Sequence, residues 1–84
     1  MHQVHRPRVV DIDVHHIWPM GQGGPDIALN RVAICPTGHR NVHELLREYM
    51  HRGGDVPWEV RRLYAPGERR LAKLGWDRMQ RNAV

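Results

Sequence analysis

The sequence predicts an α+β fold in which a β-hairpin leads into a helix and further helices follow at the carboxyl end. The stretch VVDIDVHHIW alternates apolar and polar residues, which predicts a strand over about residues 9–16. The stretch ALNRVAIC, with its β-branched residues, predicts a second strand over residues 28–35. The stretch HRNVHELLREYMHR combines good helix formers with an apolar stripe, which predicts a helix.

The connections between these elements carry turn-forming residues. Residues 19–25 contain three glycines between two prolines, so we expect a long loop joining the strands of an antiparallel hairpin. Pro36 ends the second strand, and the helix is expected to begin at Thr37 or Gly38 and to stop at Gly53 and Gly54. Beyond it, the sequence predicts a short helix around PWEVRRLY and another helix around GERRLAKLGWDRMQ, separated by Ala-Pro-Gly.

A chain of 84 residues is long enough for a single domain with a modest core. We divide residues 1–84 into a basic arm (1–8), a hairpin and helix core (9–51) and a carboxy-terminal helical extension (55–84). Cys35 is the only cysteine, so an intrachain disulfide is impossible. Small domains usually need stabilisation beyond their hydrophobic core, and without a disulfide this can come from a bound metal or from a partner chain. The sequence does not determine the oligomeric state.

Composition restricts the functional class. The sequence has no apolar run of membrane-spanning length and no apolar centre of a secretory signal near its start, so we expect a cytoplasmic protein without membrane contact. The net charge of +4 comes almost entirely from arginine, whose donor fork suits phosphate, although a GC-rich genome would also favour arginine. Serine is absent, which excludes a serine nucleophile.

Histidine is the compositional outlier, with seven residues, four of which lie between positions 15 and 43. His39 and His43 are four apart on the predicted helix, so both imidazoles lie on one face and can hold one ion. Zinc proteases with such a pair place glutamate after the first histidine, and Arg40 stands there instead. His15 and His16 are neighbours on a strand and should point to opposite faces, one completing a metal site and the other serving as a neutral base.

Together, DVHHIWP, Asn30 and CPTGHRNVH resemble the HNH nucleases and their ββα-metal motif over about residues 9–51. The separations of 14, 9 and 4 positions between His16, Asn30, His39 and His43 are similar to those of nuclease colicins and small phage-encoded HNH proteins. The resemblance implies metal binding by His15, His39 and His43, with His16 as general base and Asn30 bracing the loop that carries it.

The resemblance also implies a reaction. The expected activity is metal-dependent endonuclease hydrolysis of phosphodiester bonds in DNA, with nicking and low sequence specificity. The cofactor would be one divalent ion, zinc, nickel, manganese or magnesium, and three imidazoles favour zinc in the purified protein. Phage relatives add terminase and other packaging proteins as partners, in a bacterial or phage-infected cell. The alternative is a non-catalytic structural-zinc module that binds nucleic acid, which would not explain a fourth histidine or Asn30.

The sequence also suggests roles for several arginine, cysteine, aspartate and tryptophan residues. Arg6, Arg8 and Arg40 are candidates for gripping backbone phosphate. Many HNH proteins hold a structural zinc with two Cys-x-x-Cys pairs that this chain lacks, so Cys35 is expected to be a buried core thiol. Asp11 and Asp13 are expected on a solvated face. We expect Trp18 to pack beside Pro19 under the loop, and Trp58 and Trp76 to fill the core.

Overall fold

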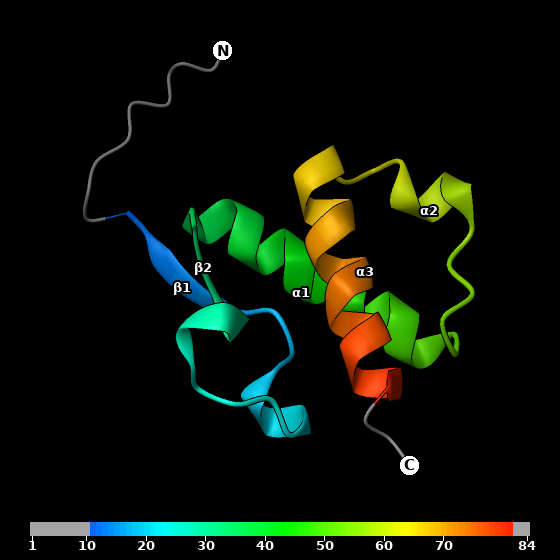
Figure 1. Ribbon diagram of the computed structural model, residues 1–84. Coiled ribbons are helices and arrows are strands. Elements are labelled where there is room, and N and C mark those ends of the chain that lie inside the picture. The colour runs from blue at the N-terminus through cyan, green and yellow to red at the C-terminus, as the bar shows by residue number, and fades with distance from the viewer. Residues whose placement is uncertain (1–10, 82–84) are drawn as a thin grey trace.

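The computed structural model describes residues 11–81 and has the α+β class expected from the sequence, a β-hairpin followed by a helix (Figure 1). The elements in chain order are β1 (Asp13–His16), the 3-10 turns η1 (Met20–Gln22) and η2 (Ala28–Asn30), β2 (Arg31–Ile34), α1 (Pro36–His51), α2 (Trp58–Arg61) and α3 (Pro66–Arg81). The hairpin lies beside α1, and α3 crosses α1 (Figure 1). Within residues 11–81, no helix has both the length and the apolar character needed to cross a bilayer.

The hairpin is antiparallel, with His15 opposite Val32 and His16 opposite Arg31. It is shorter than predicted, because residues 28–30 form the turn η2 and not the start of the second strand. The cause is local hydrogen bonding: the backbone N–H of Asn30 donates to the carbonyl of Ile27 and closes a turn there. A further hydrogen bond joins the two sides of the hairpin next to the strands, where the Ile17 N–H donates to the Asn30 carbonyl at 2.9 Å.

Helix α1 begins at Pro36, slightly earlier than expected, because proline suits the first helical position. Cys35 is its N-cap, and the Cys35 Sγ accepts a hydrogen bond from the Gly38 N–H at 3.3 Å. The expectation of a buried core thiol was therefore wrong, since Cys35 is exposed. The helix stops before Gly53 and Gly54, whose φ angles of 66° and 94° lie in the left-handed region that glycine tolerates.

The buried hydrophobic residues come mainly from α1 and α3, the two helices that cross in Figure 1. Its buried members are Val42, Leu45, Leu46, Tyr49, Val56, Ala72 and Met79. Trp76 stacks on Tyr49 with 6.3 Å between ring centroids, and Trp18 also packs against this cluster. Trp58 does not fill the core as expected: it is half exposed, and the guanidinium groups of Arg61 and Arg69 lie over its ring.

A close backbone approach joins α3 to the end of the hairpin. Gly75 is buried, and a Cβ atom at this position would lie 2.5 Å from the Ile17 carbonyl oxygen. Only a residue without a side chain allows this distance. Helix α3 therefore supports the chain immediately after His15 and His16.

Candidate metal centre

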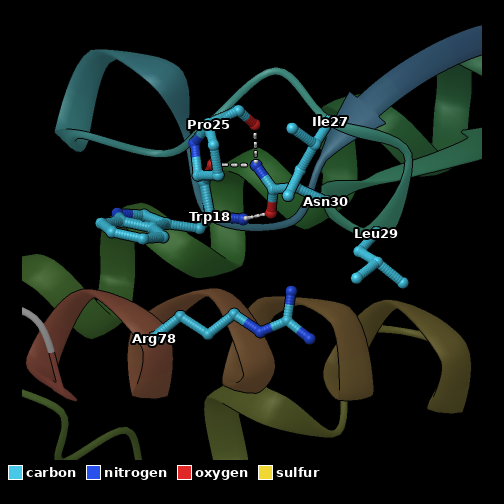
Figure 2. A pocket seen from close by; sticks show the side chains of 6 residues that line it. All are labelled: Trp18, Pro25, Ile27, Leu29, Asn30 and Arg78. Atoms are coloured by element: carbon cyan, nitrogen blue, oxygen red, sulfur yellow. Dashed lines mark hydrogen bonds between the residues drawn. The ribbon is translucent and has the colours of Figure 1, made fainter.

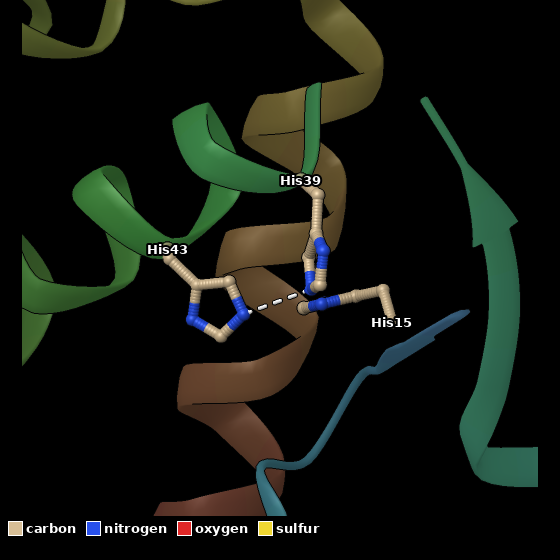
Figure 3. A group of neighbouring side chains, drawn as sticks. All are labelled: His15, His39 and His43. Carbon is tan, nitrogen blue, oxygen red and sulfur yellow. Dashed lines mark hydrogen bonds between the residues drawn. The ribbon is translucent and has the colours of Figure 1, made fainter. Parts of the chain in front are cut away.

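His15 lies in β1 and points from the hairpin toward α1 (Figure 3). Its side chain is completely buried, and neither ring nitrogen has a hydrogen-bond partner among residues 11–81. Leaving a buried polar group unpaired is costly, so native structures rarely do so without a ligand, water or ion to complete the site. The two bare nitrogens of His15 are therefore the clearest sign of a binding site in the described part of the chain.

His39 and His43 approach His15 from successive turns of α1 (Figure 3). Their ring centroids lie 5.2 and 5.3 Å from that of His15, and their Nε2 atoms are 3.0 Å apart. One potential ligand nitrogen from each of the three residues falls within a 4.8 Å group. Tetrahedral zinc with Zn–N bonds of 2.0–2.1 Å separates its nitrogens by roughly 3.3 Å. The three histidines could therefore hold a metal ion with small side-chain adjustments.

Asp13 fixes the orientation of one of these rings. Its Oδ2 lies 3.0 Å from His39 Nδ1, which leaves His39 Nε2 facing the cluster. A carboxylate behind a histidine in this way sets its tautomer and raises its strength as a ligand. The expectation that Asp13 belongs to a solvated face missed this contact, although its spacing of two residues from His15 placed both on one strand face.

The electrostatics of the cluster favour neutral rings. The pKa of His15 is lowered from 6.5 to about 4, first by burial and then by the nearby imidazoles of His43, His39 and His16. The pKa of His43 is also lowered, by burial first and then by His39 and Arg47. Both side chains are therefore uncharged at neutral pH, with lone pairs available to a cation.

His16 is adjacent in sequence and has different surroundings. It is outside the three-histidine group, and its Nε2 lies 2.8 Å from Asp26 Oδ1 in the loop. Arg31 Nε lies 3.6 Å from the same oxygen. The alternation of a strand separates the two histidines as the sequence predicts, but nothing in the local pattern indicated Asp26 as a partner of His16.

Asn30 is 3% exposed and joins two sides of the loop between the strands (Figure 2). Its Oδ1 accepts from the Trp18 N–H, and its Nδ2 donates to the carbonyls of Trp18 and Pro25, each at 2.9 Å. The same residues line a pocket with Ile27, Leu29 and Arg78 (Figure 2). The functional role that the resemblance implies for Asn30 stays a prediction.

The three arginines named as phosphate contacts are placed as follows. Arg40 is exposed on α1, directly after His39. Arg6 and Arg8 lie outside the described residues, as does the basic arm to which they belong.

Comparison with known proteins gives a short stretch of similarity. Over 32 residues the chain is 47% identical to the type IV methyl-directed restriction enzyme EcoKMcrA of Escherichia coli (strain K12). This stretch covers 38% of the chain and 12% of that enzyme, so the two proteins share only a small part of the enzyme's length. No protein-family model matches the chain, and no solved structure matches it.

Proposed function

We propose that this chain is a metal-dependent DNA endonuclease of the HNH class that hydrolyses phosphodiester bonds. The observation that carries the proposal is the buried His15, whose ring nitrogens have no hydrogen-bond partner within residues 11–81 and which faces His39 and His43. His16 lies beside it and contacts Asp26 instead. A structural zinc site is normally closed by four protein ligands, whereas three histidines would leave a coordination position open. A fourth histidine, partly exposed and bound to a carboxylate, is what a hydrolytic site requires as a base.

Each residue would have a distinct role. His15, His39 and His43 would hold one divalent ion, which we expect to be zinc in the purified protein, while Asp13 orients His39. Bound there, the ion would supply Lewis-acid stabilisation of the negative charge that develops on a phosphodiester during hydrolysis. His16 would take the proton of the attacking water.

DNA is the proposed substrate for two reasons. The chain shares a stretch of 32 residues with a protein described as a methyl-directed restriction enzyme, which favours DNA as the substrate. The net charge of +4 and the exposed Arg40 beside His39 favour an anionic polymer. Because backbone contacts of this kind do not distinguish bases, we propose nicking with low sequence specificity. We further propose that the protein acts in the cytoplasm, as part of a larger assembly such as a phage packaging terminase. The cleavage chemistry would be the same in that setting.

The test is cleavage of supercoiled plasmid by metal-stripped protein, titrated with zinc, nickel, manganese or magnesium. We expect nicked circles with at least one metal and none after chelation. The His16→Ala variant should keep its metal and fold but lose about 10²- to 10⁴-fold in rate, the usual contribution of a general base. An active His16→Ala variant would remove His16 from this role. Wild-type protein that binds DNA but cuts it with none of these metals would instead indicate a non-catalytic zinc module.

A further inference from the structure

We propose that Asp26 is a positioning residue for His16: its carboxylate selects the tautomer of the imidazole and fixes the direction of the ring. This inference rests on the proposed nuclease function and assigns a role to a loop residue outside the motif residues. Asp26 does not touch the three-histidine group; it acts through His16 alone.

The contact determines which nitrogen of His16 can act as a base. Asp26 Oδ1 lies 2.8 Å from His16 Nε2. The pKa of Asp26 is lowered by the hydrogen bond from His16 and by the charge of Arg31, so the carboxylate is ionised at neutral pH and can only accept. His16 Nε2 must therefore carry the hydrogen. A neutral imidazole has one N–H, so Nδ1 keeps its lone pair and is the atom that can accept a proton from water.

The surrounding loop holds Asp26 in place. Its neighbour Pro25 is fixed through its carbonyl, which accepts a hydrogen bond from Asn30 Nδ2 at 2.9 Å (Figure 2). On the other side, Arg31 is the register partner of His16 in the hairpin and lies 3.6 Å from the Asp26 carboxylate. A continuous series of contacts thus runs from Asn30 through the loop to His16. Through these contacts the buried side-chain amide of Asn30 can influence the position of the His16 ring.

The exposure of Asp26 makes its proposed role separable from stability. Its side chain is 62% exposed, and ion pairs on the surface contribute little to folding. Removing the carboxylate should therefore leave the fold and the metal content unchanged. A residue that only held the loop together would instead lower the melting temperature when it is replaced.

The kinetic test compares Asp26→Ala with Asp77→Ala, a matched control that removes another exposed aspartate, paired with Lys73 on α3. Using metal-saturated protein and plasmid DNA, we expect Asp26→Ala to lower kcat by about 10- to 100-fold with KM within about twofold, as for other residues that orient a catalytic group. Asp77→Ala should match the wild type. Asp26→Glu, which keeps a carboxylate on an exposed loop, should recover much of the lost kcat.

The tautomer is measured separately, by long-range ¹H–¹⁵N correlation spectra of the zinc-loaded protein. We expect His16 to be the Nε2–H tautomer in the wild type and a mixture in Asp26→Ala. An unchanged kcat and an unchanged tautomer in Asp26→Ala, beside an active wild type, would overturn the inference. If the wild type cuts no DNA with any metal, the proposed function fails, whereas the spectra still decide whether Asp26 sets the His16 tautomer.

Discussion

His15 and His16 show how two identical neighbouring residues acquire different chemistry. His15 is fully buried between the hairpin and α1, where burial lowers its pKa and its nitrogens face other imidazoles. The side chain of His16 is 24% exposed and contacts a carboxylate. The alternation of a β-strand is sufficient to produce this division, because consecutive side chains leave opposite faces.

His43→Ala should lower metal affinity and thermal stability together, because it removes one of the three nitrogens that converge on the site. Zinc content after dialysis and thermal unfolding of the zinc-loaded protein measure the two effects. His51→Ala is the matched control, since this histidine is exposed at the end of the same helix. Unchanged zinc content in His43→Ala would refute its assignment as a ligand.

Asp13→Asn should weaken zinc binding by about 10- to 100-fold while leaving the fold intact, because it removes the charge that orients His39 and strengthens it as a ligand. Competition with a chromophoric chelator gives the affinity. Asp11→Asn, an exposed aspartate just before β1, is the control and should bind zinc like the wild type. Equal affinities for the two variants would show that the Asp13 contact does not influence the site.

The three histidines that lie together, and the separate His16, could be named as candidates from the sequence, whereas their carboxylate partners could not. His39 and His43 follow from helical periodicity, and the family resemblance supplies His15, His16 and Asn30. The contacts of Asp13 and Asp26 join residues 26 and 10 positions apart through the placement of a helix and a loop. Periodicity within one element does not contain that information.

At the scale of the elements, the sequence predicted each strand and helix of the hairpin–helix core but not its boundaries. The second strand starts later than expected because the Asn30 N–H closes a turn with Ile27. Helix α1 starts earlier because Pro36 and the thiol of Cys35 together favour an N-terminus there. Both differences come from individual residues and their local hydrogen bonds, which a pattern of apolar residues does not describe.

Gly75→Ala should destabilise the protein, because its Cβ would meet the Ile17 carbonyl and push α3 away from the end of the hairpin. Overpacking of this kind costs about 1–3 kcal/mol, which in a domain of this size lowers Tm by roughly 5–15 °C. Gly67→Ala, in the first turn of the same helix with open space around it, should be neutral or slightly stabilising. Equal melting temperatures for the two variants in calorimetry would contradict this packing.

At the scale of the whole molecule, the hairpin is weakly anchored by hydrophobic contacts. The buried core belongs mainly to α1 and α3, while Ile12 and Val14 are 53% and 57% exposed. Partly buried Trp18 and Ile34 connect the hairpin region to the core. The histidine cluster is therefore a substantial part of what lies between β1 and α1, and its charge state should influence global stability.

The metal-free protein should lose stability as the pH falls. The pKa of His15 is about 4 when folded, compared with an ordinary value of 6.5, so between these values the unfolded chain binds more protons. Stability is then fully present above about pH 6.5 and decreases toward pH 4, and the lowered pKa of His43 acts in the same direction. Thermal unfolding in chelator at several pH values tests this. His15→Gln should show a shallower dependence, and an equal slope in both proteins would assign the effect to other groups.

The distribution of the three histidines along the chain has a topological consequence. An ion bound to His15, His39 and His43 would close a ring containing the glycine-rich loop, β2 and the first turns of α1. Closing a ring of this length lowers the conformational entropy of the unfolded chain, which corresponds to a free energy of about 3–4 kcal/mol in favour of the folded state. With a single cysteine, the chain has no intrachain disulfide to do the same. A protease cut in the loop would then leave two fragments joined through the ion, which a chelator would separate.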